Sequence, residues 1–152
     1  MYSQLSLQDF SIENSNKRYT LKVIQLEYDT IILDFGKGGK HVTLSPNKII
    51  WGLHYSLNDS LIYSFNHLNL HEREVLISEN GNNIIILNQF VNFDKLNRNT
   101  MALEFFLKGQ LTKSYKLKSI ITPKEQLIKI GEEGIWCMTD YEIINDSILK
   151  LN

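Results

Sequence analysis

The side chains best suited to acid–base or metal chemistry in this sequence are its four histidines, His41, His54, His67 and His71. His67 and His71 are four residues apart, and Glu72 follows them. On a helix this spacing brings two imidazoles to one face, where they can bind zinc, but on a strand it separates them by about 13 Å. The H-E-x-x-H order of zinc enzymes is absent. We therefore interpret this region as a solvated edge or loop and predict no metal ligands and no cofactor.

A second candidate for chemistry is a serine–histidine pair. His54 and Ser64 fall on the polar faces of two neighbouring predicted strands, opposite each other in the expected register. Such a pair, joined by a carboxylate, is the minimum for an activated nucleophile. The nucleophile-elbow motif is absent around Ser64, which favours an ordinary surface serine. An enzyme that uses one or two of the histidines is one functional alternative, ranked third of those given below, and a protein without catalytic activity is favoured.

The string from Gly36 to Lys40 is rich in glycine and lysine but lacks the spacing of a phosphate-binding loop, and no helix follows it. Strand-like residues on both sides indicate a hairpin tip. Lys37 and Lys40 would then form a small exposed cationic spot, which makes them candidate partner contacts. Cys137 stands in an apolar run without a nearby cation, so we interpret it as a core residue.

Four aromatic residues, Trp51, Tyr55, Tyr63 and Phe65, fall on one face of a predicted hairpin. Aromatic rings in a row can stack on sugars or bases, and in a closed barrel they would line a ligand cavity. The same face also carries Leu53, so it is too apolar to be left in water. The core is the favoured interpretation, and contact with a ligand or partner is the functional alternative.

A polar, asparagine-rich stretch follows the strand-like residues 84–93. Leu96 and Arg98 lie in it and would be the anchors if this loop contacts a partner, because binding residues are often carried on loops.

The hydrophobic residues recur with a period of two rather than 3.6, in short runs separated by turn residues, which predicts an all-β fold. We expect a mainly antiparallel meander, closed as a barrel or split into a two-sheet sandwich, in a single domain over residues 1–152. One short helix is expected near 123–130, with Thr122 as its N-cap and Pro123 at its first position. The run Ile84–Leu87 is apolar on both sides and predicts either a central strand or a strand covered by the helix. The expected strands are 5–12, 18–27, 30–36, 40–44, 49–57, 61–67, 74–79, 84–93, 100–107, 110–121, 135–139, 141–144 and 148–151.

Four hairpins can be placed in register from their apolar residues. A two-residue turn at Gly38-Gly39 would set Phe35 opposite Val42. A three-residue loop at 58–60 would set Tyr55 opposite Tyr63.

The other two hairpins lie in the second half of the chain. A three-residue loop at 108–110 would set Leu103 opposite Tyr115, and a loop at 145–147 would set Ile143 opposite Leu149.

The charge balance and the lengths of the apolar runs argue against two classes of partner. Sixteen basic residues stand against 17 acidic ones, a net charge of -1, whereas nucleic-acid binding usually needs a basic surplus. The longest apolar run, at 84–87, is too short to cross a bilayer. With one cysteine and no signal-peptide pattern at the start, we expect a cytoplasmic protein that binds neither nucleic acid nor membrane.

These features favour a non-catalytic protein-binding domain, in a concrete version an inhibitor or immunity-type protein that neutralises a toxin or enzyme. A small-molecule-binding β-barrel is the alternative. Homodimer formation through an edge strand is a further prediction, with the hairpin from Tyr141 to Leu151 as the candidate edge.

Overall fold

The computed structural model describes residues 7–88, 90–92, 100–120, 128–130, 133–135, 141–144 and 148–151, with side chains for 7–88 and 100–120. The described chain is mostly antiparallel β structure, which confirms the predicted fold class. None of its helices is long and apolar enough to cross a membrane.

The first four-stranded sheet has the order β1-β2-β3-β4. Its strands are β1 (Ser11–Glu13), β2 (Tyr19–Asp34), β3 (Lys40–Tyr55) and β4 (Leu61–Asn66). Strands β2 and β3 each join two strands that the sequence predicts as separate. The turn-type residues at 28–29 and 45–47 are accommodated by a register shift between Glu27 and Tyr28. Pro46 is tolerated because, among the described strands, only β2 pairs with this part of β3, so no second ladder needs its missing N–H.

The second four-stranded sheet has the order β5-β6-β8-β9. Its strands are β5 (Glu74–Ile77), β6 (Asn83–Leu87), β8 (Met101–Leu107) and β9 (Gln110–Lys116). Strand β6 lies between β5 and β8, and all four residues of the run Ile84–Leu87 are buried. The prediction of a central strand at this run is confirmed.

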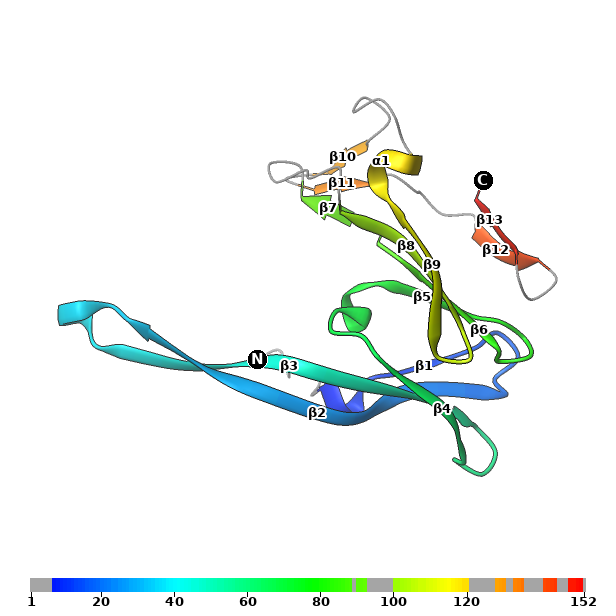
Figure 1. The fold of residues 1–152 in the computed structure, drawn as a ribbon, viewed down its shortest axis with the longest axis horizontal. Helices are drawn as coiled ribbons and strands as arrows, with labels where there is room; N and C mark the ends of the chain where they lie inside the picture. The colour runs from blue at the N-terminus through cyan, green and yellow to red at the C-terminus, as the bar shows by residue number, and fades with distance from the viewer. Residues whose placement is uncertain are drawn as a thin grey trace.

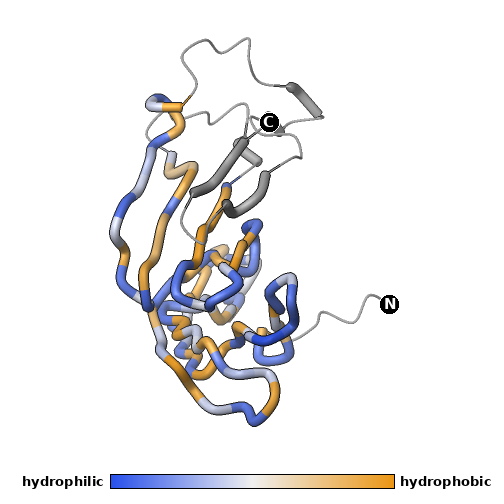
Figure 2. The backbone as a smooth tube through the Cα atoms, turned by 90° about the vertical axis from the view of Figure 1, so that its right-hand side faces the viewer, coloured by the Kyte–Doolittle hydropathy of each residue, from blue (hydrophilic) through white to orange (hydrophobic). Residues whose placement is uncertain are grey.

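One hydrophobic cluster joins the two sheets. Trp51, Leu53 and Phe65 enter it from the first sheet, and Ile84 and Phe106 enter it from the second. The described strands do not close into a barrel, and the two four-stranded sheets enclose the core as a sandwich does. Figure 2 shows hydrophobic residues running through these strands, with hydrophilic residues at the turns. Each fully buried leucine or isoleucine in such a core contributes about 1.5–3 kcal/mol.

The outer face of the second sheet carries a smaller apolar cluster. Ile85, Leu87 and Leu103 form it, and Ile120 of helix α1 packs against it. Helix α1 (Leu117–Ile120) is the single α-helix of the described residues. These residues also include three short 3-10 turns, η1 (Leu7–Asp9), η2 (Gly36–Gly38) and η3 (Leu70–Glu72).

The predicted position of the helix needs correction. Residues 128–130 were expected to end it, but Ile128–Ile130 form strand β10, while 123–127 lie outside the described residues. Strand β10 pairs with β11 (Glu133–Ile135), which pairs with β7 (Phe90–Asn92). The ladder satisfies the backbone groups of these residues, and the β-branched Ile128 and Ile130 suit a strand.

One hairpin follows the predicted register throughout and another follows it in part, because the predicted three-residue loop at 108–110 is wrong: Leu107 pairs with Gln110, which leaves a two-residue turn. In the β8–β9 hairpin, Leu103 pairs with Tyr115, and near the turn the pairing shifts by one residue at a bulge beside Phe105. Strands β12 (Tyr141–Ile144) and β13 (Ile148–Leu151) pair as predicted, with Ile143 opposite Leu149. Among the described strands these two pair only with each other, and a homodimer through their edge stays a prediction.

The other two registers are wrong. The β2–β3 turn spans more than two residues, because residues 36–38 form η2, and Val42 therefore pairs with Ile32 instead of Phe35. The β3–β4 loop is also longer than predicted, so Tyr63 pairs with Leu53 instead of Tyr55. Both predictions assumed the shortest loop that matched apolar residues, and the actual loops close with local backbone hydrogen bonds from Phe35 and Tyr55.

The outer part of β2 and β3, residues 27–48, leaves the sandwich as a long two-stranded ribbon, which we call the arm (Figure 1). In Figure 1 the arm extends alone to one side, away from the other described strands. Strand β1 pairs with β2 at residues 20–22 only, and β4 pairs with β3 at residues 50–54 only. The arm therefore has no third strand on either edge among the described residues.

Candidate functional site

The predicted aromatic set divides between the core and the surface. Trp51 is fully buried, and its indole N–H donates a hydrogen bond to the carbonyl oxygen of His67 at 2.8 Å. Phe65 is also buried, with its ring centroid 4.9 Å from that of Phe106. These two residues are core residues of the sandwich.

The two tyrosines of the set lie nearer to the surface. The Tyr63 hydroxyl donates to the carbonyl oxygen of Gly81 at 2.7 Å, and burial raises the pKa of this hydroxyl. Tyr55 is exposed, with one side of its ring against Tyr19 at a centroid distance of 5.5 Å. Tyr55 is thus the member of the set best placed to contact a partner, and that role stays a prediction.

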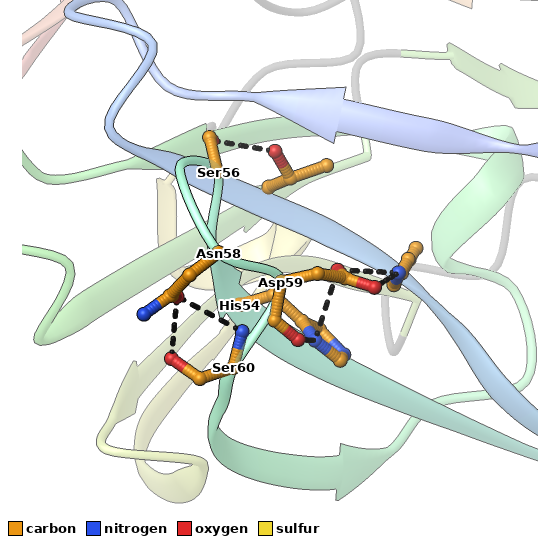
Figure 3. Close-up of polar contacts among 7 residues, drawn as sticks. His54, Ser56, Asn58, Asp59 and Ser60 are labelled. Carbon is orange, nitrogen blue, oxygen red and sulfur yellow. Dashed lines mark hydrogen bonds and ion pairs between the residues drawn. The ribbon is translucent and has the colours of Figure 1, made fainter.

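A polar cluster surrounds His54 on the outer face of the first sheet (Figure 3). His54 is buried, and its Nδ1 lies 3.0 Å from the carbonyl oxygen of Asp59 and 3.4 Å from a carboxylate oxygen of the same residue. The Lys22 ammonium donates to both Asp59 carboxylate oxygens, at 2.6 and 2.8 Å. The hydrogen bond from Lys22 lowers the pKa of Asp59.

The loop beside His54 needs these contacts because its backbone is strained. Asp59 has a φ of 57°, in the left-handed region that non-glycine residues rarely adopt. Asn58 Oδ1 accepts hydrogen bonds from the Ser60 backbone N–H and hydroxyl, as Figure 3 shows. His54 and Lys22 hold Asp59 from the sheet side. The cluster therefore fixes the loop between β3 and β4.

The structure does not place Ser64 beside His54. Ser64 pairs with Gly52, and His54 is opposite Leu61, so the predicted Ser64–His54 juxtaposition is wrong. His54 Nε2 is buried and has no hydrogen-bond partner. It lies against Gly52, where an added Cβ atom would be 2.9 Å away from it. These contacts indicate a structural role, in which the buried His54 side chain supports the loop at Asp59.

This packing leads to a stability prediction for Gly52→Ala. The new methyl group would lie 2.8 Å from side-chain atoms of Ile24 and Leu61, and 2.9 Å from His54 Nε2. We expect the free energy of unfolding to fall by about 1–3 kcal/mol, as for other overpacked sites. Urea denaturation followed by circular dichroism measures this change, and Ser64→Ala, which adds no atoms opposite Gly52, is the control. An unchanged midpoint for Gly52→Ala would contradict the crowding seen here.

A second histidine links the two sheets. His67 follows β4 in the first sheet, and its Nε2 lies 2.8 Å from Glu104 Oε2 on β8 of the second sheet. Arg73 is half-buried near them, and desolvation lowers the pKa of its guanidinium, opposed by the charges of Glu72 and Glu104. His71 Nε2 lies 3.7 Å from Glu72 Oε1. Within the described residues, no group of three metal-type side chains forms.

The link predicts a specific loss of stability for Glu104→Ala. This change would leave His67 Nε2 without its acceptor inside the sandwich. We expect a loss of about 1–3 kcal/mol, the usual cost of an unpaired buried polar group. Thermal and urea unfolding would report it, with Glu74→Ala as the matched control, because Glu74 is an exposed glutamate at the start of β5. Equal stability of the two variants would show that the His67–Glu104 contact contributes nothing.

The arm carries large apolar side chains on both of its faces. One face presents Tyr28, Ile32, Val42 and Leu44, since residues paired across the ladder and residues two apart share a face. Ile32, Val42 and Leu44 are 60%, 59% and 62% exposed. The opposite face presents Ile31 and Leu33, at 41% and 44% exposure, and Phe35 follows at the turn with 64%. Among the described residues no further strand pairs with the arm, so these side chains stay exposed on both faces.

Polar side chains fix the arm where it leaves the body. The Asn47 amide donates to Asp29 at 2.7 Å, and Lys48 is 3.1 Å from Glu27. Hydrogen bonds from Lys48 and then Gln25 lower the pKa of Glu27. These contacts lie beside the register shift at Glu27, where the two strands would otherwise be free to slide.

The tip of the arm is cationic. Gly36 and Gly39 adopt φ values of 63° and 91°, which allow the tight turn, and Asp34 accepts a hydrogen bond from the Gly36 N–H at 2.9 Å. Lys37 and Lys40 are exposed there, as expected for a hairpin tip. Between Asp34 and Asp59 the sequence contains no carboxylate side chain.

The remaining predicted contact residues, Leu96 and Arg98, lie outside the described residues, as does Cys137.

The described fold and surface define an antiparallel β-sandwich with a projecting apolar arm. No family model matches this chain, and comparisons with curated proteins and with solved structures also find no match.

Proposed function

We propose that this chain is a non-catalytic protein-binding domain that binds its partner through the arm, acting in the cytoplasm as an inhibitor or immunity-type protein that neutralises a toxin or enzyme. The observation that carries the proposal is the set of exposed apolar side chains on both faces of the arm. Single exposed apolar residues are common in monomeric proteins, but a contiguous group usually marks an interaction surface.

The energetics of the arm support a protein partner. Covering a large apolar side chain contributes about 1.5–3 kcal/mol, and the most exposed side chains, such as Ile32, Leu44 and Phe35, lie close together on one ribbon. Their ladder contacts hold them in place before binding, which reduces the entropy that association costs. Apolar rows are also poorly suited to the phosphates of nucleic acids, which basic side chains bind.

The small-molecule alternative receives less support. The hollow lined by Gln8 and residues 23–26 has a volume of about 230 Å³. Ligand pockets usually measure about 300–1,000 Å³. Trp51 and Phe65, the aromatic residues that would line a barrel cavity, are packed in the core.

The proposal predicts that a protein partner depends on the arm. Native mass spectrometry of the protein purified from its own host would show a second protein in a one-to-one complex. The double variant Ile32→Ser, Leu44→Ser should bind this partner at least about tenfold more weakly, since two exposed anchors on one face are lost. Leu57→Ser is the matched control, because Leu57 is 98% exposed on a loop of the body.

Two results would contradict the proposal. The first is repeated isolation of the unaltered protein without any protein partner under conditions in which the host expresses it. The second is a complex that the arm variant and the Leu57 control bind equally well.

A further inference from the structure

Building on this proposed function, we infer that the arm binds by insertion: it enters a cleft of the partner protein whose walls are apolar and whose floor is acidic. The inference concerns the shape and the charge of the partner's site. It uses three properties of the arm, namely the distribution of its apolar residues, its dimensions and the charge at its tip.

The apolar residues require contact on both faces. Ile32, Val42 and Leu44 lie on one face, whereas Ile31 and Leu33 lie on the other. A partner that docks against one face leaves the other row in water. A cleft covers both rows at once, because its two walls pack against opposite faces of the ribbon.

The dimensions of the arm argue against a second copy of this chain as the occupant. From Tyr28 to Asp34 the ribbon is roughly 24 Å long and roughly 10 Å wide, so one face offers roughly 240 Å². Two arms stacked face to face would bury roughly 500 Å² in total, well under the roughly 1,200 Å² of stable interfaces. Insertion uses both faces and the tip, which at least doubles the area that one arm contributes.

The charge at the tip specifies the floor of the cleft. Lys37 and Lys40 are exposed at the far end, and His41 follows them. The nearest carboxylate, that of Asp34, stands opposite Lys40 in the ladder and offsets only one of the two lysine charges. The end that enters first is therefore positive, and Asp or Glu side chains on the partner are its complement. The acidic active-site cleft of an enzyme combines this floor with apolar walls, in agreement with an inhibitor.

Cross-linking from defined positions tests the geometry. Photoreactive benzoylphenylalanine replaces Ile32 in one variant and Leu33 in another, so that it points from opposite faces. We expect both variants to cross-link to the same partner chain, at peptides on opposite walls of one cleft. A water-soluble carbodiimide should join Lys37 or Lys40 to a partner Asp or Glu, and the variant Lys37→Arg, Lys40→Arg should lose this amide bond but keep binding.

Charge reversal gives the matching affinity test. The variant Lys37→Glu, Lys40→Glu should bind the partner that cross-linking identifies at least about tenfold more weakly, because like charges then meet at the floor of the cleft. The control is Lys113→Glu on β9, which reverses an exposed charge on the body.

The outcomes separate the inference from the proposed function. Absence of any protein cross-link from all positions overturns both. Three outcomes overturn insertion alone: cross-links from one face only, cross-links to a second copy of this chain, or a charge reversal that binds as tightly as its control. Capture of the Ile32 or Leu33 variant by phosphatidylserine vesicles, with no protein product, would overturn both in favour of a lipid surface.

Discussion

Replacing Trp51 with alanine is expected to lower the free energy of unfolding by about 3–5 kcal/mol, the usual range for removing a large buried aromatic side chain. Trp51 is fully buried at the centre of the sandwich, with Phe10 packed edge-on at 5.8 Å. The variant also removes the indole N–H from the His67 carbonyl oxygen. Total stabilities of single domains are about 5–15 kcal/mol, so this one change threatens the fold.

The measurement is urea unfolding followed by far-ultraviolet circular dichroism. Trp51→Phe retains most of the apolar volume but not the hydrogen bond, so it should lose less than Trp51→Ala and stays measurable if the alanine variant does not fold. Leu57→Ala is the control, because Leu57 is almost fully exposed. A loss below about 1 kcal/mol for Trp51→Ala would show that the cluster does not depend on this residue.

Deleting the arm should abolish partner binding and leave the sandwich folded. Leu26 and Ile49 are paired across the ladder, so residues 27–48 can be replaced by Asn-Gly, which forms a two-residue turn between paired strands. The core cluster contains no residue of the deleted segment. We therefore expect the free energy of unfolding to change by less than about 1 kcal/mol, and affinity for the partner to fall by at least about 100-fold.

Two measurements on the shortened chain check this expectation. Circular dichroism and urea unfolding report on the sandwich, and titration with the purified partner reports on binding. If the shortened chain is folded and still binds, the arm is not the binding site. If it does not fold, the arm stabilises the sandwich, and the serine variants at Ile32 and Leu44 then decide the binding question.

Local patterns predicted those elements whose side-chain alternation agrees with their final surroundings. The run from Ile84 to Leu87 is apolar at every position, and β6 is buried on both faces. Ile143 and Leu149 pair as expected, as do Leu103 and Tyr115. In both hairpins, one register pairs these apolar residues with each other, and the loop is short.

The predictions failed where a loop is longer than the shortest one that pairs apolar residues, or where pairing with a distant strand decides the local structure. The turn at Gly36 and the loop at Asp59 both use positive φ angles in longer loops than the apolar pairing had suggested. Residues 123–130 carry capping signals for a helix, but Ile128 and Ile130 lie in a ladder with β11. Pairing with a distant strand provides hydrogen bonds that outweigh a weak helix preference.

The candidate site was predictable only at its tip. Glycine and lysine residues between strand-like runs indicated that Lys37 and Lys40 lie at a hairpin tip, which is confirmed. The exposure of Ile32 and Leu44 depends on the absence of a third strand along the arm among the described residues, and the sequence pattern is the same with or without that strand. Trp51 and Phe65, in contrast, lie in the core. The sequence favoured this position because their face of the hairpin carries other apolar residues.

The long ladder between β2 and β3 also sets an order for folding. Asp34 and Lys40, paired at the tip, are close along the chain, whereas Tyr19 and Tyr55, paired at the other end, are far apart. Because closing a short loop costs less entropy than closing a long one, the ladder can zip from the tip toward the body, each pair shortening the loop for the next. The arm would then form early and draw Leu21 and Leu53 together before the second sheet packs on them, so that the segment proposed for recognition also nucleates the first sheet.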